Sequence, residues 1–409
     1  MLRELASCPR ILLAARAFGL VLLTGHATAQ WPQWGGPERD FRSPATGLAD
    51  AWPESGPKRL WERELGPGYS SIVSDDGRLF TLALSAEHET VVALDAKTGA
   101  SLWEYRLRAV SGNEPPNSTP VLAGDKLYAL GFSGLLCALD KESGKLAWSH
   151  DLLTEYGAKQ PMYGFAASPL AYRDALIVPV GGKGFGVAAF ALADGKLLWH
   201  AHDFDEIYAS PLLIEVEGEA QVAVLTAERI AGLDPANGAL LWSEPIENAG
   251  GQNIATPVWS ADRLYVTSGT RGSVALKLAR KDGKTQVEHA WKNDKQIAQT
   301  TVVQVGDYLY GSTGHDKLFV TAVHAATGAV AWQHEGFSVA NLVAADGKLV
   351  LLDYDGVLAL CTASSAGLKV HSKAKVLEPQ AFTPPTLAGQ TLYLRDLKSL
   401  LALDLGKPD

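Results

Sequence analysis

Three short patterns of this sequence could do chemistry, and the first is a pair of histidines. His200 and His202 are one residue apart, so in a strand both imidazoles would point from the same face and could bind a metal ion. Other histidines also follow a tryptophan closely, as His150 follows Trp148. We therefore interpret these histidines as surface residues of separate outer strands rather than as a metal site.

Two neighbouring patterns offer other chemistry. Residues 181–186 are rich in glycine, as phosphate-binding loops are, but they lack the Lys-Ser/Thr pair of such loops and precede a predicted strand. Asp203, Asp205 and Glu206 form an acidic run without the glycine and the final Glu of a calcium loop. We interpret the first as a hairpin and the second as a solvated loop. The sequence holds no nucleophile elbow, so it predicts no catalysis.

The elements that would carry these residues belong to a repeat. Its clearest copy has Ala138, Asp140, Gly144 and Trp148, and the glycine-to-tryptophan spacing of four recurs along the chain. A period of about 40–50 residues is typical of propellers and other repeat arrays. Each copy holds four short apolar runs separated by Gly/Asp turns, which favour hairpins. Four antiparallel strands make one propeller blade.

The number of blades follows from the first strand of each copy. These strands begin at eight places, namely Ser71, Thr119, Ser168, Ser210, Thr256, Thr301, Asn341 and Thr383. The final copy ends near Leu405 after three strands, whereas residues 58–65 form a strand without a partner. We therefore predict an all-β fold, an eight-bladed β-propeller of four-stranded antiparallel blades over residues 58–406. An N-terminal strand completes the last blade and closes the ring.

Most of the tryptophans occupy one position of the repeat. Seven of the eleven stand in the closing position, namely Trp61, Trp103, Trp148, Trp199, Trp242, Trp291 and Trp332. A buried tryptophan removes about 150–250 Å² from water. That area stabilises the fold by about 4–6 kcal/mol before entropy. We predict that these side chains dock one blade onto the next.

The first 57 residues precede the repeat. Residues 1–29 combine arginines, an apolar run over 11–23 and a small-residue site at 27–29, a pattern typical of an export signal. A retained membrane anchor is the alternative. Residues 30–57 are rich in Pro, Gly and Trp and predict an N-terminal lead-in segment without regular structure. We expect an exported protein, periplasmic or extracellular, with no membrane span in the mature chain.

Charge and cysteine content limit the partners. The net charge is −9, and residues 1–29 carry +2 (three Arg, one Glu), so the rest of the chain carries −9 − 2 = −11. An acidic surface argues against nucleic acid and anionic membranes as partners. Cys137 and Cys361 lie in predicted strands of distant copies. We interpret them as small core residues.

The repeated phrase of Ala, Asp, Gly and Trp resembles the tryptophan-docking motif of pyrroloquinoline-quinone (PQQ)-like propellers. The resemblance covers residues 58–406. That superfamily contains quinoprotein alcohol and glucose dehydrogenases, and a non-catalytic propeller subunit of the machinery that assembles outer-membrane β-barrels. In the dehydrogenases of this superfamily, PQQ lies over the channel beside a vicinal disulfide and a bound calcium ion. If this chain were such an enzyme, the resemblance would imply the same site. This sequence has no adjacent cysteines and no haem motif, so we predict no cofactor and keep PQQ with calcium as the alternative.

The residues just ahead of each innermost strand should converge on one mouth of the channel. They are Tyr69, Asn117, Tyr163, Phe165, Tyr208, Asn253, Gln299, Asn341 and Phe382. The two longest connections, residues 106–116 and 151–165, enter the same mouth, and such loops commonly form the binding surface of a repeat array. Aromatic and amide side chains suit a binding face, although they could also simply plug the channel.

The leading hypothesis is a non-catalytic scaffold that binds a protein through these loops. A PQQ/calcium-dependent dehydrogenase and a sensor of a small ligand such as a sugar are the alternatives.

Overall fold

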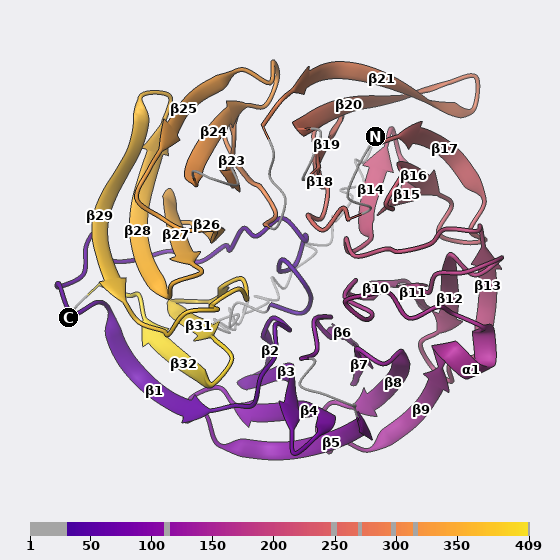
Figure 1. The fold of residues 1–409 in the computed structure, drawn as a ribbon, viewed down its shortest axis with the longest axis horizontal. Helices are drawn as coiled ribbons and strands as arrows, with labels where there is room; N and C mark the ends of the chain where they lie inside the picture. Colours follow the sequence, from indigo (N-terminus) through magenta and orange to yellow (C-terminus); the bar gives the residue numbers. More distant parts are fainter. Residues whose placement is uncertain are drawn as a thin grey trace, which may run out of the picture.

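The computed structural model describes residues 31–109, 115–246, 252–268, 272–295, 300–313 and 318–407. Within these residues, thirty-two strands form eight four-stranded antiparallel sheets. The sheets stand around a common centre like the blades of a propeller (Figure 1). The predicted all-β, eight-bladed architecture is confirmed.

The blades are numbered along the chain. The strands of blades 1 and 2 are β2 (Val73–Asp75), β3 (Arg78–Ser85), β4 (His88–Asp95), β5 (Ser101–Ala109), β6 (Val121–Ala123), β7 (Lys126–Leu130), β8 (Leu135–Asp140) and β9 (Leu146–Asp151). Helix α1 (Leu152–Tyr156) follows β9. Blades 3 and 4 contain β10 (Leu170–Tyr172), β11 (Ala175–Pro179), β12 (Val187–Ala191), β13 (Leu197–Ala201), β14 (Leu212–Val216), β15 (Glu219–Leu225), β16 (Arg229–Leu233) and β17 (Leu240–Pro245).

The second half of the ring follows the same order. Blades 5 and 6 contain β18 (Val258–Ser260), β19 (Arg263–Ser268), β20 (Gly272–Lys281), β21 (Lys284–Asn293), β22 (Val303–Val305), β23 (Tyr308–Thr313), β24 (Phe319–His324) and β25 (Val330–His334). Blade 7 contains β26 (Ala340–Ala345), β27 (Lys348–Asp353), β28 (Val357–Ser364) and β29 (Gly367–Lys375). Blade 8 contains β30 (Thr386–Ala388), β31 (Thr391–Arg395), β32 (Ser399–Asp404) and β1 (Lys58–Glu64).

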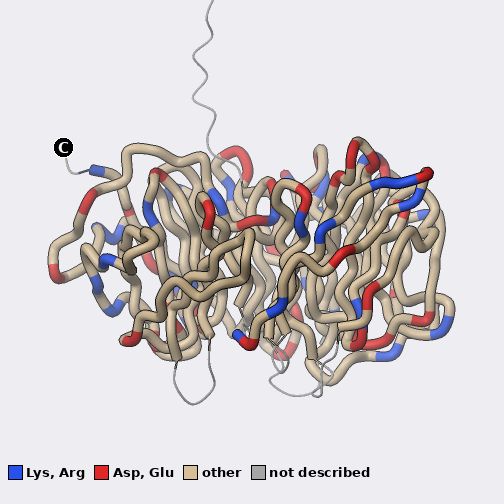
Figure 2. The backbone as a smooth tube through the Cα atoms, turned by 90° about the horizontal axis from the view of Figure 1, so that it is seen from above, with Lys and Arg blue, Asp and Glu red and all other residues tan. Residues whose placement is uncertain are grey.

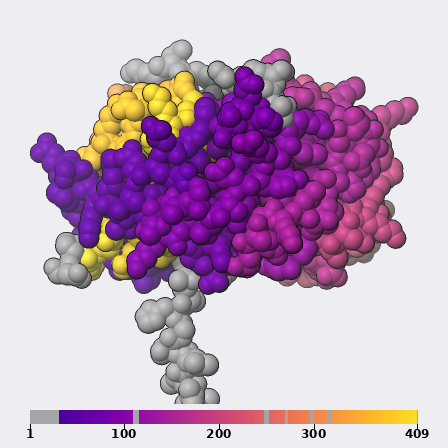
Figure 3. Space-filling model, turned by 90° about the horizontal axis from the view of Figure 1, so that it is seen from below, coloured from indigo at the N-terminus to yellow at the C-terminus, as the bar shows by residue number. Residues whose placement is uncertain are grey.

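The ring closes where the two ends of the propeller meet. Strand β1 pairs antiparallel with β32, from Lys58 opposite Asp404 to Glu64 opposite Ser399. The earliest and latest described segments accordingly lie side by side on the surface (Figure 3). The prediction that an N-terminal strand completes the last blade is confirmed.

A buried arginine joins blade 8 to blade 1 at this closure. The Arg395 side chain is fully buried and donates to the carbonyl oxygens of Leu82 (2.8 Å) and Gly66 (2.9 Å) and to Thr81 Oγ1 (3.1 Å). Burial lowers the pKa of the guanidinium to about 10. Three oxygen atoms of blade 1 and of the segment that leads into it therefore accept hydrogen bonds from one guanidinium of blade 8.

The repeated Asp and Gly form the turn before the outer strand in blades 1, 2 and 4. In blade 1, Asp95 Oδ1 accepts hydrogen bonds from the Thr98 N–H (2.8 Å) and the Thr98 hydroxyl (2.7 Å). Gly99 has a φ of 72° and donates its N–H to the Asp95 carbonyl oxygen (2.8 Å). This left-handed glycine is the last residue of a four-residue connection and is followed by a bulge in the outer strand. The glycine recurs in this turn in blades 3 and 6 as well, where Ala191 and His324 stand in place of the Asp.

The repeated tryptophans lie between blades. In six of the seven, the indole N–H donates to a backbone carbonyl of the next blade, in the pairs Trp61–Ala96, Trp103–Lys141, Trp148–Leu192, Trp199–Pro235, Trp291–Ala325 and Trp332–Ser364, at 2.7–3.1 Å. Five indoles cover the turn glycine of the following blade, so that a Cβ on Gly99, Gly144, Gly195, Gly238 or Gly328 would stand 2.6–2.7 Å away.

Trp242 is the exception. Its indole N–H donates to Gln221 Oε1 within blade 4 (2.7 Å), and the Gln221 amide continues to Thr285 Oγ1 of blade 5 (2.7 Å). In blade 5 the spacing from Gly283 to Trp291 is eight instead of four, so its turn lies farther along the strands from the tryptophan. A side-chain amide therefore replaces the direct contact.

Residues 31–57 cross the middle of the ring (Figure 1). They contain no strand longer than an isolated bridge and pair with the ends of innermost strands, Trp31 with Ser74 and Arg42 with Ala344. The side chains of Trp31 and Phe41 are buried. Both belong to the hydrophobic core of blades 6, 7 and 8, so the lead-in is packed against the ring.

The remaining features of the described residues concern the surface and the cysteines. Lys and Arg are interspersed with Asp and Glu over the disc seen edge-on (Figure 2). The one helix in the described ranges has five residues, and no helix there could cross a bilayer. Cys137 and Cys361 are free and buried in blades 2 and 7, and burial raises the pKa of each thiol to about 12. Both are core residues, as predicted.

Candidate functional site

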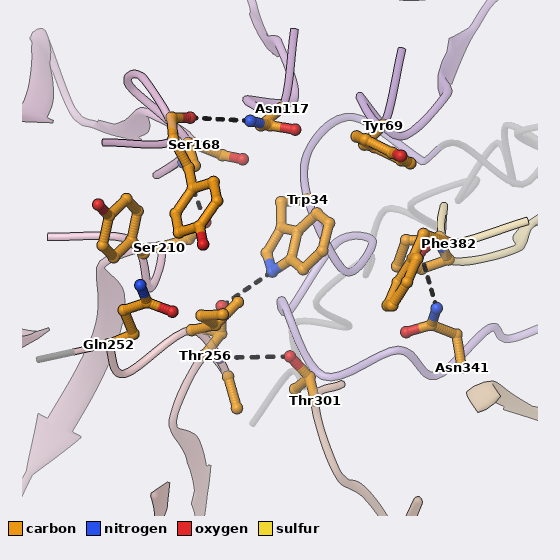
Figure 4. Close-up of a pocket in the computed structure, with 16 residues that line it drawn as sticks. Trp34, Tyr69, Asn117, Ser168, Ser210, Gln252, Thr256, Thr301, Asn341 and Phe382 are labelled. Atoms are coloured by element: carbon orange, nitrogen blue, oxygen red, sulfur yellow. Dashed lines mark hydrogen bonds between the residues drawn. The ribbon is translucent and has the colours of Figure 1, made fainter. Parts of the chain in front are cut away.

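A cavity of about 400 Å³ opens at one end of the channel. We call it the cup. Its lining comes from the lead-in and from all eight blades or the loops that enter them, namely Trp34, Tyr69, Asn117, Tyr163, Ala166, Ser168, Tyr208, Ser210, Gln252, Ile254, Ala255, Thr256, Thr301, Asn341, Phe382 and Pro384. Since the segments that lead into the innermost strands converge here, the ring itself positions these side chains (Figure 4).

Six of the residues singled out in the sequence line the cup. They are Tyr69, Asn117, Tyr163, Tyr208, Asn341 and Phe382. Tyr163 and Tyr208 form an edge-to-face pair with ring centroids 6.0 Å apart, and Tyr69 and Phe382 form a second pair at 6.1 Å. Burial raises the pKa of Tyr69 and of Tyr208 above the usual range, so both remain neutral phenols.

Two of the predicted residues that the structure describes do not line the cup. The Phe165 side chain is buried in the core of blades 2 and 3, where a Cβ on Gly134 would stand 2.7 Å from its ring. Asn253 is buried too, donates to the carbonyl oxygen of Thr226 (2.8 Å) and is not among the residues that line the cavity. For both, the expectation of a place at the mouth is corrected. Gln299 lies outside the described residues.

The floor of the cup is a residue that the sequence did not single out. Trp34 belongs to the lead-in, and its indole N–H donates to Thr256 Oγ1 (3.0 Å, Figure 4). Its ring meets Phe41 edge-to-face, with centroids 5.2 Å apart. Trp34 lies outside the repeat, so only the density of aromatic residues in the lead-in could have indicated it.

Arg39 closes the channel beside this floor. Its buried guanidinium donates to the carbonyl oxygens of Pro211 (2.8 Å) and Pro169, and to Gln33 Oε1 (2.9 Å). Burial lowers the pKa of Arg39 to about 9. The lead-in is thereby attached to the residues just before two innermost strands, β10 and β14, and closes the inner end of the cup.

Hydroxyl groups link the blades around the wall of the cup. Each accepts a hydrogen bond from a backbone N–H of the preceding blade, in the pairs Ser71–Thr119 (2.9 Å), Thr119–Ser168 (3.0 Å), Ser168–Ser210 (3.0 Å) and Thr256–Thr301 (3.3 Å). This contact explains why Ser or Thr recurs at the start of the innermost strands. A hydroxyl that accepts one bond still carries a hydrogen to donate.

Two amides are fixed by the backbone. Asn117 Nδ2 donates to the carbonyl oxygen of Tyr163, and Asn341 Nδ2 donates to that of Phe382, both at 2.9 Å (Figure 4). Each bond holds the side chain in one orientation and leaves its Oδ1 atom as an acceptor. The cup thus offers hydroxyl donors, amide acceptors and aromatic rings in fixed places.

The described lining of the cup carries no Asp, Glu, Lys, Arg or His. Among the described residues, Tyr163 and Ile254 of the lining are exposed by 50% and 38%, and Met162, next to Tyr163, by 73%, and we call these three the rim. A calcium ion in a protein usually takes carboxylate oxygens, and PQQ carries three carboxylates that would need cationic or strong donor partners. This donor set does not fit PQQ with calcium.

The histidines of blade 3 make separate contacts. His202 Nε2 lies 2.8 Å from the carbonyl oxygen of Gly238 in blade 4, whereas His200 stacks on Phe185 with ring centroids 3.9 Å apart. In the described ranges, no three His, Cys, Asp or Glu side chains are close enough together to hold a metal ion.

Comparison with known proteins places the chain in a family. The family profile described as "Outer membrane protein assembly factor BamB" matches residues 50–151 and 87–334, more than half of the chain. The chain belongs to the BamB family. BamB of Shewanella oneidensis is 22% identical over 347 residues, which are 81% of this chain and 82% of that protein. In the solved structures, BamB from Moraxella catarrhalis has a TM-score of 0.62 at 18% identity, over 85% of this chain and 97% of that one. At 18% identity, this structural similarity shows only that the two chains share a fold.

Quinoprotein dehydrogenases are similar over shorter stretches. The quinoprotein alcohol dehydrogenase PedH of Pseudomonas putida is 28% identical over 146 residues, which are 34% of this chain and 23% of the enzyme. This chain therefore spans less than a quarter of the length of that dehydrogenase. The BamB matches extend over most of both chains, and the dehydrogenase match does not.

Proposed function

We propose that this protein is an exported, non-catalytic scaffold that binds a protein partner through the mouth of its channel, in the assembly of outer-membrane proteins. The observation that carries the proposal is a cup without charged side chains in its described lining, beside the exposed Met162, Tyr163 and Ile254, on a ring of the BamB family. The name of the relatives, outer membrane protein assembly factor, supports the same setting.

The geometry supports binding rather than turnover. The rim residues Met162, Tyr163 and Ile254 are large, apolar and exposed around a cavity. Apolar residues grouped in this way on a folded surface commonly mark an interaction site, and a Tyr is a frequent centre of protein interfaces. The blades are rigid sheets held by inter-blade hydrogen bonds, so the mouth presents a preformed surface.

A dehydrogenase activity is the second candidate, because the chain matches PedH over about a third of its length. The described lining of the cup has no charged side chain to bind calcium or the PQQ carboxylates, which argues against a dehydrogenase activity. Titration of the purified protein with PQQ and calcium, followed by a dye-reduction assay with alcohols, would detect such an activity.

Photocrosslinking in the native cell envelope tests the scaffold. A photoreactive amino acid at position 163 or 254 should give a defined adduct with one partner protein. The matched control is position 240, since Leu240 is 49% exposed on the outer strand of blade 4, much like Tyr163. Equal adducts from position 240, or none from either rim position, would contradict the proposal.

A further inference from the structure

The cup has one opening. Beneath it, Trp34 bonds to Thr256 and Arg39 bonds to the carbonyl oxygens of Pro169 and Pro211, so the lead-in blocks the channel. An occupant must therefore enter and leave through the same mouth. A loop tip or a single side chain can do this, whereas an extended chain threaded through the ring cannot.

The lining selects for an uncharged occupant. The described lining residues bear no formal charge, although charged residues make up 20% of the whole sequence. A buried charge without a partner costs several kcal/mol relative to water. Five aromatic side chains, namely Trp34, Tyr69, Tyr163, Tyr208 and Phe382, offer ring faces and edges to another aromatic group.

The polar groups of the wall match a polypeptide backbone. The Oδ1 atoms of Asn117 and Asn341 can accept N–H groups, while the hydroxyls of Ser168 and Ser210 can donate to carbonyl oxygens. The exposed rim continues beyond the cavity, since Met162 is 73% exposed and does not line it. A free sugar ring would leave that rim uncovered, whereas the flanks of a loop would cover it.

We infer that the cup receives an uncharged aromatic side chain from the tip of a partner protein's loop, whose backbone bonds to the amides and hydroxyls of the wall. This inference rests on the proposed function and adds the chemistry of the partner. The residues on either side of the loop tip contact the rim, and the inserted aromatic ring packs against the indole of Trp34.

A selection from displayed loops tests the inference while the partner protein is still unidentified. The full chain, without its predicted signal, is used to select from a phage library of disulfide-closed seven-residue loops. We expect the selected loops to share Trp, Tyr or Phe at the apex and to lack Asp, Glu, Lys and Arg there. Loops with charged apices, or a library that yields no binder, would overturn the inference.

A charge placed in the cup gives the second measurement. Gln252 lines the cavity and makes no hydrogen bond within the described residues, so Gln252→Glu changes charge with little change of shape. It should weaken the selected loops at least about tenfold, because a carboxylate there must be desolvated by the inserted ring. Gln286→Glu makes the same change on the exposed face of β21 and should have no effect. Equal affinity for both variants would overturn the inference.

The two proposals fail in different ways. Suppose that the crosslinks at positions 163 and 254 persist and that Gln252→Glu still binds both the partner and the selected loops. The proposed scaffold function is then supported, and the inference of an inserted aromatic side chain is wrong. If the crosslinks are absent, the proposed function itself fails. Glucose that binds and displaces the selected loops would make the occupant a saccharide and overturn the inference.

Discussion

The indole N–H of Trp34 donates to Thr256 Oγ1 at 3.0 Å and joins residues 222 positions apart. This bond connects the lead-in to blade 5 and fixes the floor of the cup. The acceptor is the hydroxyl of Thr256. In other blades, the hydroxyl at the same position of the repeat accepts a backbone N–H from the preceding blade. The floor is therefore built into the ring by a bond that no single blade contains.

Loss of this bond should be measurable as a double-mutant cycle. Trp34→Phe removes the donor and should lower the free energy of unfolding by about 1 kcal/mol, and Thr256→Val, which leaves the indole N–H unpaired, by about 1–3 kcal/mol. The double variant should cost less than the sum, because the two changes remove one interaction. Urea unfolding measures all three, and strictly additive costs would contradict the contact.

Gly232 is required by the unusual contact of Trp242. A Cβ at position 232 would stand 2.0 Å from the indole nitrogen of Trp242, whereas the equivalent position in blade 2 holds Ala138. We expect Gly232→Ala to destabilise the protein by about 1–3 kcal/mol through overpacking. The same change in a Trp242→Phe background should cost less, since the nitrogen is gone. A harmless Gly232→Ala would show that the indole is free to move.

Arg395 should be essential to ring closure. Arg395→Met keeps most of the volume but leaves the carbonyl oxygens of Gly66 and Leu82 without their donor, so it should cost about 3 kcal/mol or more. Amide exchange should rise first in β1 and β32, which form the closure. Arg229→Met, at an exposed position of β16, is the control and should change stability by less than about 0.5 kcal/mol.

Glu89 should make stability depend on pH. Burial raises the pKa of its carboxyl, against the opposing effects of the hydrogen bonds from Phe132 and Ser133 and of the charge of Arg108. Since the folded-state pKa is the higher one, its contribution to stability is present at low pH and is lost as pH rises through that value.

Comparison with Glu89→Gln isolates this contribution. The wild type should lose stability relative to the variant as pH rises from about 4.5, and the difference should level off above the folded-state pKa. Urea midpoints of both proteins between pH 4.5 and 7.5 measure it, and other carboxylates cancel because both proteins share them. A difference that grows in favour of the wild type with rising pH would contradict the raised pKa.

The sequence by itself determined the ring. Turns such as Asp95 to Gly99 and the docking place of Trp103 use contacts within one blade or between neighbours, and the same pattern recurs in most blades. Local and repeated interactions leave a periodic signal that can be counted, so the eight blades and the closing strand β1 could be predicted from the sequence.

Only the tertiary structure decided the cup. Trp34 lies in a segment without periodicity, and its partner is known only once the lead-in has crossed the ring. In two loops, the residue that lines the cup is the neighbour of the one predicted. Gln252 lines it where Asn253 was expected, and Ala166 where Phe165 was expected. Loop backbones do not alternate their side chains regularly as strands do, and the direction of each was set by packing against residues distant in the sequence.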